Sequence, residues 1–147
     1  REMDLVSQII KCVKLKTDIV AQDERESGKR AILNYGHTLA HALELENQFS
    51  LAHGEAVAVG IRYAAEVAYQ LDRIDRKRVR YHEEILNHYG LTYSLPSQIN
   101  EENIISHFSR DKKAHDGATF VLDGESGVEI VKVRNKNILE KALEVIQ

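Results

Sequence analysis

The stretch Arg30-Ala-Ile-Leu-Asn-Tyr-Gly-His-Thr-Leu-Ala-His41, followed by His53-Gly-Glu55, carries most of what this sequence says about fold and function. His37 and His41 are four residues apart, so a helix would place both rings on one face, one turn from each other. Neutral imidazole is a good zinc ligand, and two rings at this spacing could hold one ion. The spacing alone is weak evidence, because such pairs are more common on plain helix surfaces.

Two further residues extend the same face toward the N-terminus. Asn34 lies three residues before His37, and Arg30 lies four before Asn34, which predicts a continuous polar stripe on a helix from about Arg30 to Glu46. Arginine presents fixed donors to carboxylate or phosphate, so an anionic ligand is expected near this stripe. His53 directly precedes a glycine and an apolar helical pattern, a position that suits a ligand held at a helix N-terminus.

The rest of the chain predicts a mainly α, multi-helix fold with one small β-hairpin. Pro and Gly are sparse, and apolar residues recur at helical spacing over residues 4–22, 30–46, 54–71, 75–89, 101–109 and 137–146. β-Branched runs at 119–122 and 128–133 flank a turn sequence, which predicts a hairpin near residues 119–133. No internal boundary is visible, so residues 1–147 are expected to form a single helical domain.

Composition narrows the class of partner. The chain has 147 residues, 43% hydrophobic and 29% charged, which is ordinary for one globular domain. The formal net charge of −3 gives no field that would recruit nucleic acid or an anionic membrane. No apolar run approaches the length of a membrane span. Because Cys12 is the only cysteine in the sequence, the chain can form no internal disulfide, which fits a reducing cytoplasm. Cys12 itself is interpreted as a small core residue.

Six blocks of this sequence resemble 3-dehydroquinate synthases, and they occur in that family's order. They are Lys16-Thr-Asp-Ile-Val20, Asp23-Glu-Arg-Glu26, Arg30-Ala-Ile-Leu-Asn-Tyr-Gly-His-Thr38, His41, His53-Gly-Glu-Ala-Val-Ala58 and Asp111-Lys-Lys113. The chain is thus similar to the metal-binding C-terminal domain of a sugar-phosphate cyclase. The resemblance implies a phosphate-eliminating lyase of the shikimate pathway of aromatic amino acid biosynthesis, which cyclises the sugar-acid phosphate DAHP to 3-dehydroquinate with NAD and a divalent metal.

The resemblance also implies roles for single residues. His37 and His53 match metal ligands, with zinc as the expected ion and cobalt as an alternative, and the third ligand, a Glu, is expected upstream of this chain. His41 and Glu26 match residues that move protons. The matching substrate contacts are Lys16, Arg30, Asn34 and His41, with one of Lys112 and Lys113 at the phosphate.

The dinucleotide is expected to bind elsewhere. No glycine-rich loop follows a strand in this sequence, so the NAD-binding N-terminal domain is expected to be absent from the chain. We therefore expect the chain alone to be inactive and to bind zinc weakly. The resemblance further implies a cytoplasmic homodimer at full length, with a small-molecule substrate as partner.

Two kinds of alternative stay open. Other sugar-phosphate cyclases, of the 2-deoxy-scyllo-inosose or valiolone type, share the scaffold, but Lys16 and Arg30 together favour a carboxylated substrate. Related iron- or zinc-dependent alcohol dehydrogenases fit less well, since Arg30, Asn34 and the Asp111-Lys-Lys113 block would have no use there. A different class is a non-catalytic helical module, against which the intact set of matching polar residues argues.

Several other polar residues are expected to be structural. Tyr35 is interpreted as packing, Glu44 as a surface or capping residue, and the run Arg73–Arg80 as a solvated helix face. For Glu55, a hydrogen bond to His53 and an ordinary place in the first turn of a helix are equally open. The remaining histidines are expected at the surface or in loops; they are His82, His88, His107 and His115.

Overall fold

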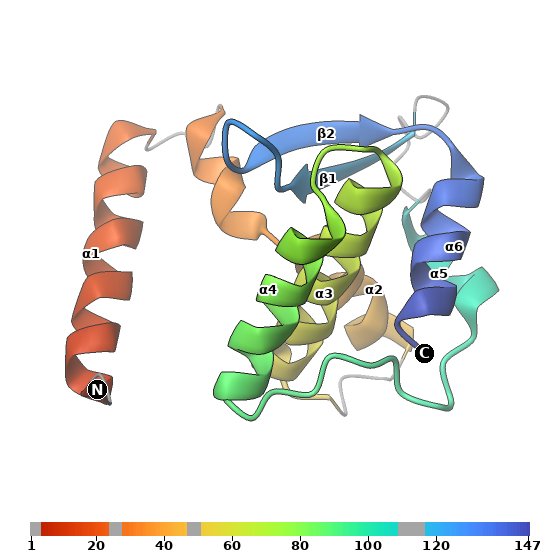
Figure 1. Ribbon diagram of the computed structural model, residues 1–147, viewed down its shortest axis with the longest axis horizontal. Coiled ribbons are helices and arrows are strands. Elements are labelled where there is room, and N and C mark those ends of the chain that lie inside the picture. Colours follow the sequence, from red (N-terminus) through yellow and green to blue (C-terminus); the bar gives the residue numbers. More distant parts are fainter. Residues whose placement is uncertain (1–3, 24–27, 47–50, 109–116) are drawn as a thin grey trace. The chain divides into compact units, whose positions relative to one another are not determined.

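The computed structural model describes residues 4–23, 28–46, 51–108 and 117–147. The chain divides into two compact units, residues 1–33 and residues 34–147, which are described separately. Figure 1 shows that the described part is mainly helical with one two-stranded hairpin. The predicted fold class is therefore confirmed. In the described residues, no helix combines the length and the apolar character needed to cross a membrane.

The first unit contains the helix α1, Leu5–Gln22. The Asp4 carboxylate caps its N-terminus by accepting from the Val6 N–H at 3.4 Å. At the other end, Asp23 Oδ2 accepts from Gly28 N at 2.9 Å and from Arg30 N at 3.0 Å, which fixes the start of the 3₁₀ helix η1, Lys29–Asn34. The prediction of a buried Cys12 was wrong, since α1 has no buried residue and Cys12 is exposed.

The second unit is built around α3, His53–Gln70, whose alanine-rich sequence allows close packing. Four other helices surround the same core: α2, His37–Glu46; α4, Arg76–His88; α5, Glu101–Phe108; and α6, Lys136–Val145. Helix α3 packs against α2, α4, α6 and the first strand, and its residues from Ala58 to Ala68 are almost all buried. Each of these helices falls within two residues of its predicted range except α2.

The hairpin consists of β1, Ala118–Leu122, and β2, Glu129–Val133. The strands are antiparallel, with Phe120 opposite Val131. β1 buries most of its side chains against α3, and Phe120 packs its ring on Tyr63 and Phe108. The hairpin predicted near residues 119–133 is confirmed.

The prediction of one helix from Arg30 to Glu46 was wrong. The 3₁₀ helix ends at Asn34, the chain turns at Gly36 with a φ of 82°, and α2 begins at His37. The turn is held by a close backbone contact with α3, because a Cβ at Gly60 would lie 1.9 Å from the Gly36 carbonyl oxygen. The regular α-helical stripe therefore includes His37 and His41, but Asn34 and Arg30 precede it.

Candidate functional site

Three of the predicted site residues meet where α2 and α3 begin, and we call His37, His41 and His53 the histidine cluster. The ring centroids of His37 and His41 are 5.6 Å apart, and those of His37 and His53 are 5.3 Å apart. His37 and His41 face the same way because both lie on α2, one turn apart. His53 reaches them from the first residue of α3, which packs against α2. The expectation that His37 and His41 share one helix face is therefore confirmed, whereas the roles of the three histidines stay predictions.

The loop before α2 sets the orientation of the His37 ring. Its Nδ1 lies 3.3 Å from the carbonyl oxygen of Tyr35. Because a carbonyl oxygen only accepts hydrogen bonds, Nδ1 is the donor, and a neutral His37 then has its lone pair on Nε2. The hydroxyl of Thr38 donates to the Thr119 carbonyl of β1 at 3.1 Å, so the same turn is also tied to the hairpin.

Glu44 orients the ring of His53 from the second turn of α2. Its Oε1 lies 2.8 Å from Nδ1 of His53. The Glu44 side chain is largely covered, at 15% exposure, whereas 58% of the His53 side chain is exposed. The interpretation of Glu44 as a surface or capping residue missed this contact. Its position seven residues after His37 places it on the same helix face and was the available signal.

Glu55 is next to His53 in sequence but serves the helix end. Its Oε2 accepts from the backbone N–H of Ala52 at 3.2 Å, across the start of α3. This arrangement satisfies one of the backbone donors that every helix N-terminus leaves unpaired. Of the two interpretations left open for Glu55, the structure supports the first-turn role.

The remaining predicted site residues have different outcomes. Lys16 on α1 and Arg30 on η1 belong to the first unit, and Asn34 is the first residue of the second. Their approach to the histidine cluster stays a prediction. Glu26, Lys112 and Lys113 lie outside the described residues, so their roles also stay predictions.

Two imidazole rings of the histidine cluster could each supply one ligand atom to a divalent cation, with further ligands needed to complete the site. His37 and His53 both have Nδ1 directed at a protein acceptor, which leaves Nε2 as the ligand atom of each neutral ring. Across residues 4–23, 28–46, 51–108 and 117–147, no three or more His, Cys, Asp or Glu side chains are grouped so that they could hold a metal ion. Two imidazoles are fewer than the three protein ligands of a typical catalytic zinc site.

Tyr35 and His82 form a partly buried polar contact that the sequence alone did not predict. The Tyr35 hydroxyl lies 2.9 Å from His82 Nε2, and His82 Nδ1 lies 2.9 Å from the Arg78 carbonyl oxygen. Since the carbonyl fixes Nδ1 as a donor, Nε2 of a neutral His82 accepts from Tyr35. Burial, and secondarily the Asp123 carboxylate, raises the pKa of Tyr35 far above its ordinary value. The surface assignment of His82 was wrong, because only 8% of it is exposed.

The arginine-rich segment after α3 is likewise more than a solvated face. Arg78 Nε donates to Asp123 Oδ2 at 2.6 Å, and Arg73 pairs with Glu129 on β2. Hydrogen bonding to Asp123, partly offset by desolvation, raises the pKa of Arg78. These contacts fasten the start of α4 to the hairpin. The interpretation of Arg73–Arg80 as a solvated helix face was therefore incomplete.

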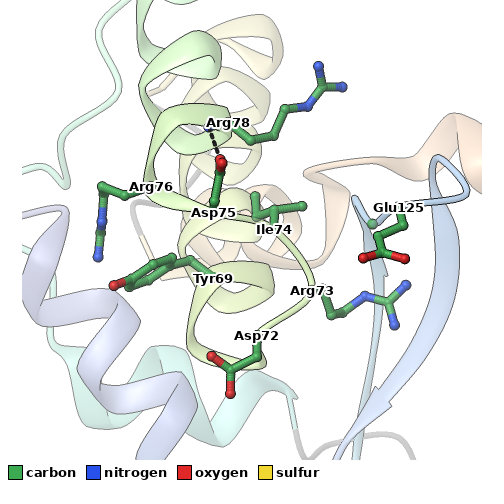
Figure 2. Close-up of a pocket in the computed structure, with 9 residues that line it drawn as sticks. Tyr69, Asp72, Arg73, Ile74, Asp75, Arg76, Arg78 and Glu125 are labelled. Carbon is green, nitrogen blue, oxygen red and sulfur yellow. Dashed lines mark hydrogen bonds between the residues drawn. The ribbon is translucent and has the colours of Figure 1, made fainter.

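A surface cavity of about 680 Å³ lies beside this segment, away from the predicted site residues. Figure 2 shows its lining, which comes from the end of α3, the connection to α4, the start of α4 and the hairpin turn. Arg73, Arg76 and Arg78 all line it, but each already pairs with a carboxylate of the protein. The cavity is thus rich in charge but has little unpaired positive charge to offer an anion, and the histidine cluster is the better candidate site.

Comparison with solved structures gives the class of fold. The chain superposes on the crystal structure of 2-deoxy-scyllo-inosose synthase complexed with carbaglucose-6-phosphate, NAD+ and Co2+, with a TM-score of 0.77 and 28% sequence identity. The match covers 90% of this chain and 40% of that one. The fold is that of the sugar-phosphate cyclases.

The family follows from the sequence. The family model described as "3-dehydroquinate synthase C-terminal" matches residues 1–114, and the chain belongs to this family. A protein named "Putative aminodehydroquinate synthase" from Amycolatopsis mediterranei (strain S699) is 48% identical over 84% of this chain and 35% of its own length. The 3-dehydroquinate synthase of Shewanella frigidimarina (strain NCIMB 400) is 41% identical over 81% of this chain and 34% of its own length. The chain spans about a third of the length of these relatives.

Proposed function

We propose that this chain is the metal- and substrate-binding part of a 3-dehydroquinate synthase. Such an enzyme cyclises DAHP to 3-dehydroquinate with elimination of phosphate, using NAD and a divalent metal. The observation that carries the proposal is the histidine cluster: three histidines predicted from the family's sequence blocks lie together, with their ring centroids 5.6 and 5.3 Å apart along the series His41, His37, His53. Family membership over residues 1–114 supports the same activity.

Within this proposal the cluster divides into two roles. His37 and His53 bind the metal through Nε2, because their Nδ1 atoms are engaged by Tyr35 and Glu44. His41 moves protons to and from the substrate, since its imidazole is exposed on the same helix face as His37 and an imidazole ring can both accept and donate a proton. The bound metal would polarise substrate oxygens as a Lewis acid.

Polar and charged side chains outside the cluster complete the substrate site. Lys16 and Arg30 neutralise the carboxylate of the sugar acid, Asn34 contacts the substrate near its phosphate, and Glu26 acts as a further acid or base. One of Lys112 and Lys113 binds the phosphate. These assignments rest on the matching sequence blocks and are part of the proposal.

The cofactors and the assembly belong to the whole enzyme. The similar 2-deoxy-scyllo-inosose synthase was crystallised with NAD+ and Co2+, which supports a dinucleotide and a divalent metal as a general requirement. We propose zinc as the metal and cobalt as a functional substitute. We further propose that NAD is bound by a part of the enzyme beyond this chain. The whole enzyme is a homodimer located in the cytoplasm.

The test is phosphate release from DAHP by a chimera. This chain replaces the matching C-terminal third of the Shewanella frigidimarina relative, and inorganic phosphate is measured with NAD and zinc or cobalt present. We expect the chimera to release phosphate and the 147-residue chain alone to release none. His37→Ala in the chimera should abolish release, and His88→Ala, which changes an exposed histidine at the end of α4, should leave it unchanged.

Failure has a clear form in this experiment. A chimera that folds and binds NAD but releases no phosphate from DAHP contradicts the proposal and favours the non-catalytic module. Release that is unaffected by His37→Ala would contradict the metal assignment alone. Phosphate release by the isolated chain would show that the division of labour proposed here is wrong.

A second candidate is an aminodehydroquinate synthase. The relative with that name has 48% identity to this chain, above the 41% of the Shewanella frigidimarina enzyme. The two activities differ in the substituent on the substrate, so the chimera should be assayed with DAHP and with its amino analogue in parallel. Faster phosphate release from the amino analogue would favour the second candidate.

A further inference from the structure

The two proposed metal ligands are held by acceptors of different kinds. His37 directs Nδ1 at the neutral carbonyl oxygen of Tyr35, at 3.3 Å. His53 directs Nδ1 at the carboxylate of Glu44, at 2.8 Å. A hydrogen bond to an ionised carboxylate is shorter and stronger than one to a neutral acceptor. The orientation of His53 thus depends on one side chain that substitution can remove, whereas that of His37 depends on the backbone.

We infer that Glu44 is a positioning residue that fixes the ring of His53 with hydrogen on Nδ1 and with Nε2 free to bind a divalent cation. This inference rests on the proposed function, because it gives the free Nε2 a use. Glu44 is suited to the role by its largely covered position on α2. Its neighbours Ala42 and Leu43 are buried, and its own side chain is only 15% exposed.

The exposure of His53 supports the same conclusion. With 58% of its side chain exposed, the ring has few packing contacts to hold it in one orientation. Among the described residues, the His37 ring and the Glu44 carboxylate lie beside it. Without Glu44, the ring could rotate about its side-chain bonds and exchange tautomers, and only part of the population would present a free Nε2 toward His37. Partners of this kind contribute to metal affinity without touching the metal.

The alternative role for Glu44 is a simple surface ion pair, which contributes little and constrains nothing. The two roles differ in what they predict for the neutral ring. A surface ion pair requires protonated His53 and has no effect on its tautomer. A positioning carboxylate selects one tautomer of the neutral ring, and that selection exists in the metal-free protein as well as in the metal-bound one.

The test measures the tautomer of His53 and cobalt binding in the 147-residue chain. Long-range ¹H–¹⁵N correlation spectra of metal-free protein, at a pH where His53 is neutral, should show hydrogen on Nδ1. In Glu44→Ala the population should shift toward hydrogen on Nε2, and the affinity for Co²⁺, followed by its visible absorption, should fall about ten- to a hundredfold. Glu44→Asp, which retains a carboxylate, should recover part of both.

The matched control is Glu55→Gln. It removes one negative charge two residues from His53, yet glutamine keeps the acceptor for the Ala52 N–H. We expect the wild-type tautomer and wild-type cobalt affinity. Circular dichroism of each variant shows whether α2 and α3 are intact, and Glu44→Leu, which also removes the acceptor, replaces Glu44→Ala if the alanine variant fails to fold.

The outcomes separate this inference from the proposed function. If wild-type protein binds no cobalt but Glu44→Ala still shifts the tautomer, the positioning role stands and the metal site in this chain does not. If cobalt binds and Glu44→Ala leaves both tautomer and affinity unchanged, Glu44 is a surface partner and the inference is wrong. A wild-type ring with hydrogen on Nε2 would also overturn it.

Discussion

The two ends of α3 carry ionisable side chains in opposite situations. At its N-terminus the side chain of His53 is 58% exposed, and one of its ring nitrogens is hydrogen-bonded to Glu44. In its second half Glu66 is 0% exposed and accepts hydrogen bonds from Arg62, Arg76 and Gln70. The same helix thus offers an accessible ligand at one end and an enclosed, paired charge at the other.

The difference shows which charged groups are available for chemistry. A buried carboxylate that accepts several charged hydrogen bonds is costly to disturb and has little capacity left for a ligand. An exposed imidazole with one nitrogen engaged keeps the other for a cation or a proton. Substitutions at the Glu66 end should therefore change stability, and substitutions in the histidine cluster should change binding and catalysis.

Glu66→Ala should have the largest effect on stability. It leaves Arg62, which is 5% exposed, with Glu83 as its remaining carboxylate, and it removes the hydrogen bonds at 2.7 and 3.1 Å from Arg76. Breaking a buried ion pair from one side costs about 3–5 kcal/mol. Urea unfolding followed by circular dichroism measures the change. Glu84→Ala on the exposed face of α4 is the control and should stay within about 0.5 kcal/mol of wild type.

The same group should also make stability depend on acid. Burial opposes ionisation of Glu66, but hydrogen bonds from Arg76, Gln70 and Arg62 hold its pKa below the ordinary value of 4.5. Below pH 4.5 the unfolded chain therefore binds more protons than the folded protein, and this contribution to stability is lost as pH falls through the folded pKa. Unfolding free energies from neutral pH down to about pH 3 should show less acid dependence in Glu66→Gln. Equal dependence in both proteins would argue against the lowered pKa.

Gly60→Ala, a substitution between the two ends of α3, should have the next largest effect on stability. A Cβ would lie 1.9 Å from the Gly36 carbonyl oxygen, and a backbone atom moves less readily than a side chain. Overpacking of this kind costs about 2–3 kcal/mol. Gly54→Ala on the same helix is the matched control, because nothing lies within 4 Å of its Cβ position. It should be neutral or stabilising by up to about 1 kcal/mol. Equal unfolding free energies for the two variants would refute the close contact.

This contact also explains what the sequence could not predict. Helical periodicity placed α1, α3, α4, α5 and α6 correctly, because local apolar spacing determines those elements. The break at Gly36 depends on a contact with Gly60, which lies 24 residues further along the chain. The local sequence pattern contains no sign of that contact, so it predicted an uninterrupted helix through Gly36. The Glu44–His53 pair and the burial of His82 likewise depend on how α2, α3 and α4 pack. The spacing of His37 and His41 was predictable because both residues lie within α2.

Tyr35→Phe should lower the free energy of unfolding by less than Gly60→Ala does. It removes the hydroxyl that lies 2.9 Å from His82 Nε2 and leaves a buried ring nitrogen without this donor. The expected cost is about 1–2 kcal/mol of unfolding free energy. Tyr81→Phe, at an exposed tyrosine of α4, should change stability by less than about 0.5 kcal/mol. If both variants unfold alike, packing of the Tyr35 ring accounts for its role, as the sequence alone suggested.

His41→Ala should have the smallest effect on stability and a large one on catalysis. The residue is exposed on α2, so its removal should change the unfolding free energy by less than about 0.5 kcal/mol. In the chimera that tests the proposed function, loss of a proton-transferring group should slow phosphate release by about 10²–10⁴-fold. Cobalt affinity should change little, since His41 is not a proposed ligand. A fall in cobalt affinity as large as that of His37→Ala would instead make His41 a ligand, and an unchanged rate would remove it from the proton-transfer role.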